Sequence, residues 1–235
     1  MYKRQVNVEF NYSTFDDCYL RSCTFNSCTF VGCKFIASNF EGSQFIGGDF
    51  QYSIFRFTNI TNELLVNNCP SYDNLKFKFA RNLRTNFQSI GDIDGVNKAI
   101  LVELESTKST LYKAWNSNES YYRSKYKGWD RFFKFVSWLK FKIGEFVWGN
   151  GESLLKLGRA VLLTLVLISI IDTFKIGETD SIKSYLSGLT NSPQLFFSID
   201  KPEYYSKQYL SLIYFFRLVF FGLFMAIVIK RFSKR

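Results

Sequence analysis

One stretch of the chain, from Val8 to Leu65, decides the fold: VEFNYSTFDDCYLRSCTFNSCTFVGCKFIASNFEGSQFIGGDFQYSIFRFTNITNELL. In it a bulky apolar residue recurs at every fifth position, and a small residue usually lies two positions earlier. Neither a helical nor a strand period produces this spacing. A five-residue unit with one large and one small inward side chain predicts a solenoid whose stacked coils share a continuous core. The predicted core residues include Phe15, Phe25, Phe30, Phe35, Phe40, Phe45, Phe50 and Phe55.

The five-residue period resembles the pentapeptide-repeat family over this stretch. The resemblance implies a right-handed quadrilateral β-helix with four pentapeptides per coil, and therefore three coils here. It also implies that Cys18, Ser38 and Thr58 stack on one face. Some members of that family mimic the DNA duplex, which requires a long acidic rod. This segment is short and nearly neutral, so mimicry is not expected.

The cysteines of the repeat are predicted to be structural. Cys18, Cys23, Cys28 and Cys33 are five residues apart, whereas metal sites use pairs two to four residues apart. Each occupies the position that Ser or Gly fills elsewhere, which predicts a small buried thiol. The odd total of five and the lack of a signal peptide predict reduced thiols in the cytoplasm.

Composition excludes several kinds of catalytic and metal site. The chain contains no histidine, which removes Ser-His-Asp and Cys-His catalysis and every histidine-containing metal site. No phosphate-binding loop or nucleophile–base pair is visible. We therefore expect neither an enzyme nor a cofactor.

Positive charge is concentrated in the C-terminal part of the chain. The net charge is +10, but residues up to Pro70 carry five Lys/Arg against six Asp/Glu, and the rest carry 25 against 14. Basic residues beside long apolar runs are typical of contact with an anionic membrane. A lipid partner is therefore expected, and a nucleic acid is not.

Residues 71–120 are predicted to form a helical connector after the repeat of residues 1–70. Apolar residues recur at helical spacing on both sides of Gly91, which indicates a helical hairpin of tetratricopeptide type. A single hairpin is too small for a peptide-binding groove, so we expect a cap or lever on the coil. The sequence Asp92–Gly95 lacks the later ligands of a calcium loop and is interpreted as a turn.

Residues 121–152 are predicted to form a basic amphipathic helix in the membrane interface. Aromatic and aliphatic residues follow helical spacing there, with Lys and Arg between them. The alternatives are a nucleic-acid-binding helix and a core helix of a soluble domain. The expected interface residues are Trp129, Arg131, Lys134, Trp138, Lys140, Lys142 and Trp148.

Residues 153–235 are predicted to form a two-pass membrane module. The apolar segments are Leu154–Phe174 and Tyr209–Ile229. Positive charge precedes the first and follows the second, so the positive-inside rule places both termini in the cytoplasm, here of a bacterial inner membrane. Residues 182–204 are predicted to form a re-entrant loop.

This module resembles the two-pass part, related to potassium channels, that some bacterial pentapeptide-repeat proteins carry. The matching features are WGNGES at Trp148–Ser153, LFFS at Leu195–Ser198 and a helix that ends in IKRFSKR. The resemblance implies four subunits around one pore. The glycine-rich filter of a potassium channel is missing, and Ile199–Tyr204 carry proline and charged residues instead. Potassium selectivity is therefore not expected.

The candidate pore or assembly residues are polar groups in or near the two apolar segments: Asp172, Arg217, Ser198, Asp200 and Lys201. Asp172 and Arg217 are about 7 Å apart along the membrane normal, which is within reach of an arginine side chain. They either pair, within or between subunits, or extend independently to the interface.

Two functions of different classes follow from this organisation. The first is an oligomeric ion-conducting pore or membrane effector under the control of a cytoplasmic repeat domain, suited to defence or cell arrest. The alternative is a membrane-anchored scaffold whose repeat domain binds a protein partner.

Overall fold

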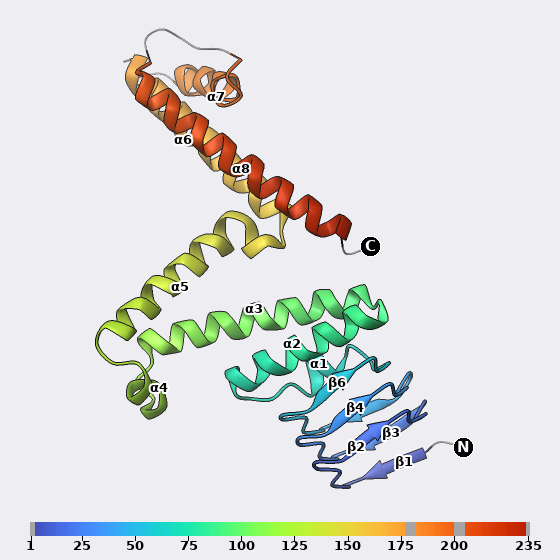
Figure 1. The fold of residues 1–235 in the computed structure, drawn as a ribbon. Helices are drawn as coiled ribbons and strands as arrows, with labels where there is room; N and C mark the ends of the chain where they lie inside the picture. Colours follow the sequence, from blue (N-terminus) through green and yellow to red (C-terminus); the bar gives the residue numbers. More distant parts are fainter. Residues whose placement is uncertain (1–2, 177–181, 200–204, 234–235) are drawn as a thin grey trace. The chain divides into compact units, whose positions relative to one another are not determined.

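The computed structural model describes residues 3–176, 182–199 and 205–233. The chain divides into two compact units, Met1–Trp138 and Leu139–Arg235. The first contains strands β1 to β6 and helices α1 to α4, and the second contains α6 to α8 (Figure 1). Helix α5, Trp129–Trp148, runs across the boundary. The division into four domains stays a prediction.

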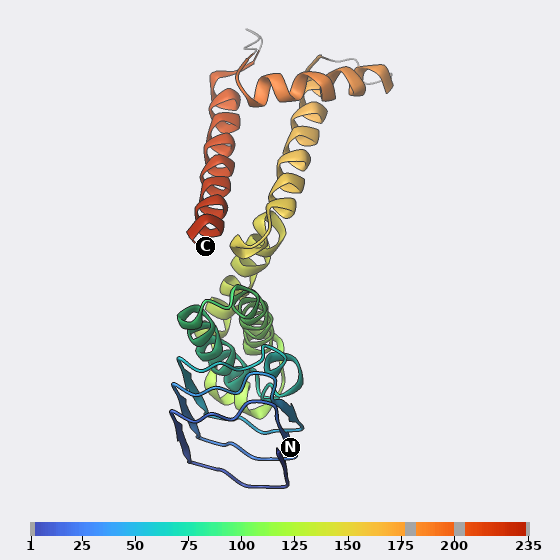
Figure 2. The same cartoon turned by 90° about the vertical axis from the view of Figure 1, so that its right-hand side faces the viewer.

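The strands of the repeat form two parallel three-stranded sheets. Their order is β1-β3-β5 and β2-β4-β6, and Phe15 pairs with Phe35 as Phe35 pairs with Phe55. Isolated parallel bridges add two further ladders, at residues 9, 29 and 49 and at residues 19, 39 and 59. The chain thus advances by one layer every 20 residues (Figure 2). The strands are Lys3–Val6 (β1), Thr14–Asp16 (β2), Cys23–Asn26 (β3), Lys34–Ile36 (β4), Gln44–Ile46 (β5) and Ile54–Arg56 (β6).

The phenylalanines of the repeat stack on one another between layers. Phe35 lies parallel to Phe15 and Phe55, with ring centroids 4.9 and 4.6 Å apart, and Phe30 stacks on Phe50 at 4.7 Å. Phe15, in the first coil, is partly buried. The other predicted core residues, Phe25, Phe30, Phe35, Phe40, Phe45, Phe50 and Phe55, are buried.

The small residues of the repeat join neighbouring layers by hydrogen bonds. Ser43 Oγ accepts from the Cys23 N–H at 3.0 Å and donates to the Leu20 carbonyl at 2.6 Å. Ser38 bridges Cys18 and Phe15 in the same way. The hydroxyl therefore satisfies backbone groups of the preceding layer that would otherwise be buried without a partner.

Cysteine takes the same position in the first layers. Cys33 Sγ donates to the Phe10 carbonyl at 3.0 Å, and all five cysteines are free thiols. Burial raises the pKa of Cys33 and raises that of Cys69 to about 11. The neutral thiol is therefore the favoured form at physiological pH.

Replacing Ser43 with alanine is expected to lower the free energy of unfolding of the coil by about 1–3 kcal/mol, because the Cys23 N–H and Leu20 carbonyl lose their partner. Hydrogen–deuterium exchange of the full-length protein in mild detergent measures this as faster exchange in residues 20–45. Ser71→Ala removes a hydroxyl from an exposed position and serves as the control. Equal exchange in both variants would mean that the bridge contributes nothing.

Helices close the end of the coil that follows β6. Asn82 Oδ1, on α2, accepts from the Phe55 N–H at 2.7 Å. Asn86, one helical turn later, accepts from the Thr58 N–H at 2.9 Å and donates to the Thr58 carbonyl at 2.8 Å. The side-chain amides of Asn82 and Asn86 thus bond the backbone groups that a further coil would otherwise pair, because buried backbone groups need hydrogen-bond partners. The helices are α1 (Leu64–Asn67), α2 (Asp73–Ile90) and α3 (Ile93–Asn116).

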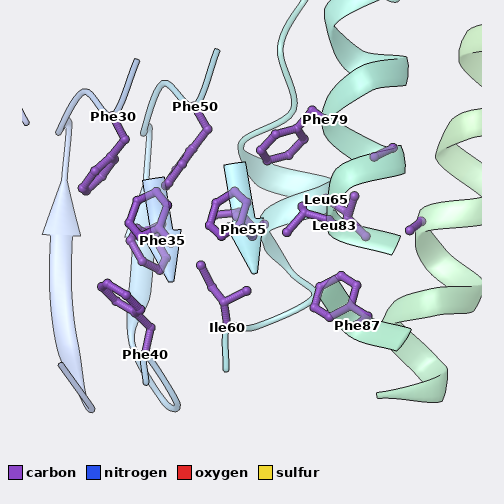
Figure 3. Packing of buried hydrophobic residues seen from close by; sticks show 14 of the residues in the cluster. Phe30, Phe35, Phe40, Phe50, Phe55, Ile60, Leu65, Phe79, Leu83 and Phe87 are labelled. Atoms are coloured by element: carbon purple, nitrogen blue, oxygen red, sulfur yellow. The ribbon is translucent and has the colours of Figure 1, made fainter. Parts of the chain in front are cut away.

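Apolar side chains of α2 extend the phenylalanine core. The ring centroid of Phe79 is 6.2 Å from those of both Phe50 and Phe55. Leu83 and Phe87 are fully buried beside it (Figure 3). At the following turn, Asp92 Oδ1 accepts from the Gly95 N–H at 2.9 Å and caps α3. Asp92 thus has a helix-capping role.

The second unit contains two helices that are long and apolar enough to span a membrane. The spans are Leu154–Phe174, within α6 (Leu154–Ile176), and Lys207–Phe232, within α8 (Lys207–Ser233). In their most apolar windows only 22% and 11% of the residues are buried. A core helix of a soluble domain would be mostly buried, so this exposure fits a lipid environment better.

Candidate functional site at the ends of the apolar helices

Helix α7, Ile182–Phe196, packs closely on α6. A Cβ atom added to Gly188 would lie 2.9 Å from Ser169 Oγ and 3.0 Å from Thr173 Oγ1. Ser169 also donates to the Tyr185 carbonyl at 3.3 Å. Only glycine permits this approach, so Gly188 sets the position of α7.

Proline inside α7 has a local compensation. Pro193 has no N–H to donate to the Leu189 carbonyl. The buried Ser192 Oγ donates to that carbonyl instead, at 3.0 Å. The helix therefore continues through the proline to Phe196 with its backbone satisfied.

Helix α7 ends in a left-handed turn at Ser198, whose φ is 57°. The Ile199 N–H donates to the Gln194 carbonyl at 2.8 Å, and the Ser198 N–H donates to the Leu195 carbonyl at 3.1 Å. This is the Schellman motif, in which glycine usually occupies the left-handed position that Ser198 takes here. The helix C-terminus carries a partial negative charge that favours a nearby cation.

Arg217 of α8 supplies that cation. Its Nη1 donates to the Phe197 carbonyl at 2.9 Å and to Ser198 Oγ at 3.0 Å. The guanidinium also lies 3.9 Å from the centre of the Tyr214 ring. Arg217 is about 15 Å along the axis from the start of α8. It therefore fixes the end of α7 beside the N-terminal half of α8.

Asp172 occupies a different environment from Arg217. Its side chain is 1% exposed, and Oδ1 has no hydrogen-bond partner among the described residues. Arg217 makes its contacts at the end of α7 instead, so the predicted Asp172–Arg217 pair is not formed within the chain. Pairing between subunits stays a prediction, although a carboxylate this deeply buried is inaccessible to another chain without rearrangement.

Of the other candidates, Ser198 contacts Arg217, whereas Asp200 and Lys201 lie outside the described residues. The sequence did not indicate the Ser198 contact, because a serine that adopts a left-handed helix cap has no distinctive pattern. The predicted re-entrant segment 182–204 is helical over Ile182–Phe196.

The predicted interfacial helix is divided in two. Helix α4, Ser120–Lys125, is separated from α5 by a turn with Gly128 at a φ of 50°. Trp138 lies on the opposite side of α5 from Trp129, and its ring centroid is 5.3 Å from that of Trp115. Trp138 follows Trp129 by nine residues, which is half a turn out of phase on a helix. Trp129 is 75% exposed.

The remaining predicted interface residues have varied surroundings. Arg131 Nε donates to the Trp115 carbonyl at 2.6 Å, and Lys142 pairs with Glu145 at 3.2 Å. Lys140 is exposed, and Trp148 precedes the turn Gly149–Gly151 that leads into α6. At this turn Lys230, near the end of α8, pairs with Glu152.

Comparison with protein families identifies the repeat. The family model described as pentapeptide repeats (9 copies) matches residues 10–61. The match ends before the helices and does not reach the two-helix module. No curated protein and no solved structure matches the chain.

Proposed function

We propose that this chain forms an oligomeric ion-conducting pore or membrane effector in a bacterial inner membrane, under the control of a cytoplasmic pentapeptide-repeat domain. The observation that carries the proposal is the pair of exposed apolar helices with α7 in contact with both. Two helices cannot enclose a water-filled path, so several copies must surround it. Four copies follow from the resemblance to potassium-channel modules.

The position of α7 supports a pore-lining role. Gly188 brings α7 against α6, and Arg217 holds its C-terminal end against α8. A half-helix inside a membrane is tolerated only where protein or a water-filled cavity surrounds it. Arg217 places a fixed positive charge near such a path, which favours anions over cations. The path is thus not potassium-selective.

The repeat provides a rigid domain for control. Its four ladders support the right-handed quadrilateral β-helix, and α2 caps one end with Asn82 and Asn86. Both termini of the chain are cytoplasmic in this proposal, because positive charge flanks the two spans on that side. No enzymatic step is part of the proposed function.

A membrane-anchored scaffold is the second candidate, and a hollow on the first unit favours it. A cavity of about 220 Å³ lies between β6 and α2, lined by Tyr52, Ile54, Lys78, Phe79 and Asn82. Tyr52 is 66% exposed, so an apolar side chain of a partner protein could bury it. In this case the membrane helices act only as a tether.

The oligomeric state of the purified full-length protein separates the two candidates. Native mass spectrometry in mild detergent, supported by light scattering, is expected to give a tetramer. If the protein stays monomeric even at concentrations well above those in a membrane, the proposed oligomeric pore is contradicted. The membrane-anchored scaffold would then be the remaining candidate.

A further inference from the structure

The turn between α4 and α5 carries a dense positive charge. From Ser120 to Trp138 the chain has five Lys/Arg and a single acidic residue, Asp130. Among the described residues, no ion pair joins any of these five cations to a carboxylate. Two lysines elsewhere in the first unit do have such partners: Lys76 pairs with Glu105 at 3.4 Å and Lys113 with Asp73 at 2.7 Å. This charge is therefore available to an external anion.

Two of these lysines are held around one aromatic ring. Lys125 Nζ lies 5.6 Å and Lys134 Nζ 5.2 Å from the centre of the Tyr126 ring. Lys125 also donates to the Tyr121 hydroxyl at 3.1 Å, which raises the pKa of Lys125 and keeps it charged. Cation–π contacts of this kind restrict flexible side chains. Both ammonium groups therefore lie beside the Tyr126 ring, where an anionic headgroup would meet two positive charges.

An apolar surface adjoins the lysines. Trp129, Phe132 and Phe133 begin α5 and are 75%, 51% and 61% exposed. The opposite side of the helix, with Phe135 and Trp138, packs on Trp115. Exposed aromatic residues beside cations are typical of segments that enter the headgroup region of a bilayer. A free phosphate would leave these three apolar side chains in water, whereas the acyl-chain boundary of a bilayer would bury them.

The geometry points to an anionic-phospholipid site formed by Lys125, Lys134 and Tyr126, with Trp129, Phe132 and Phe133 inserted beside the headgroup. This deepens the proposed function and rests on its membrane location. Trp148, which ends α5, is six residues before α6, so the chain itself keeps this end within about 20 Å of the bilayer surface. A helix lying in the interface brings Trp129 to the same surface.

The test is a titration of the full-length protein in nonionic detergent with brominated phosphatidylglycerol or brominated phosphatidylcholine. Bromine quenches tryptophan fluorescence at short range, and Trp129→Phe identifies the part of the signal that belongs to Trp129. Each lysine contributes roughly 5-fold in affinity for an anionic surface, so Lys125→Gln with Lys134→Gln is expected to weaken phosphatidylglycerol binding about 25-fold. Binding of phosphatidylcholine is expected to be weak throughout.

The matched control is Lys34→Gln with Lys78→Gln, which removes the same charge from exposed positions elsewhere in the first unit. Unchanged circular dichroism shows that each variant is folded. Equal quenching by both lipids would overturn the site. An equal loss of phosphatidylglycerol affinity in the control variant would also overturn it. So would displacement of the lipid by inorganic phosphate at the same concentration, or by an oligonucleotide. The titration measures neither current nor subunit number, so its failure leaves the proposed pore standing.

Discussion

Replacing Phe35 with alanine is expected to destabilise the repeat coil by about 3–5 kcal/mol. Phe35 is fully buried and stacks on a phenylalanine in the layer on either side. Its loss leaves a cavity in the middle of a narrow interior that backbone ladders prevent from collapsing. Because small domains are stable by only about 5–15 kcal/mol, much of the coil's stability depends on this ring.

Hydrogen–deuterium exchange of the full-length protein in detergent locates this effect. Amides of the three layers are expected to exchange far faster in Phe35→Ala, while those of α6 and α8 keep their protection. Phe57→Ala is the matched control, because Phe57 belongs to the same repeat but is 66% exposed. Unchanged exchange between residues 10 and 61 in Phe35→Ala would mean that the phenylalanine columns do not hold the coil together.

Replacing Arg217 with glutamine is expected to release the C-terminal end of α7. The Phe197 carbonyl and the Ser198 hydroxyl would lose a charged donor, and hydrogen bonds of this type contribute about 1.5–3 kcal/mol. Exchange of the amides in residues 194–199 should therefore rise at least roughly tenfold. In Arg217→Lys the exchange rate of these amides should lie between those of the wild type and the glutamine variant, because a single ammonium group replaces the planar guanidinium.

Two further variants separate this contact from a general effect of charge. Lys207→Gln removes a positive charge from the start of the same helix, at an exposed position, and should leave α7 unchanged. Ser198→Ala removes one of the two acceptors and should give a smaller rise than Arg217→Gln. If Lys207→Gln has as large an effect as Arg217→Gln, Arg217 has no specific role at the end of α7.

The repeat was predictable because its signal is periodic and local. A bulky apolar residue at every fifth position has the same neighbours in every layer, so residues 10 to 61 specify the 20-residue advance without distant contacts. The asparagines that cap the coil were not predictable. Asn82 is 27 residues from its partner Phe55, and a polar residue on a helix gives no sign of which backbone group it will contact.

The candidate site was predictable only in part. Hydropathy identified both apolar helices, and charge within them singled out Asp172 and Arg217. Their partners depend on how α7 packs, which rests on one glycine, Gly188, and on a left-handed serine, Ser198. The packing of Trp138 on α3 could not be read from the sequence, because aromatic residues occur on both sides of α5.

Planar-bilayer recording of the purified full-length protein tests the proposed pore most directly. Discrete current steps are expected, with selectivity for anions, and Arg217→Gln should reduce or reverse that selectivity while Lys207→Gln preserves it. Protease protection of the same preparation verifies insertion into the bilayer. Absence of any conductance from inserted, tetrameric protein, across voltage, pH and anionic lipid content, would contradict the pore and favour the membrane-anchored scaffold.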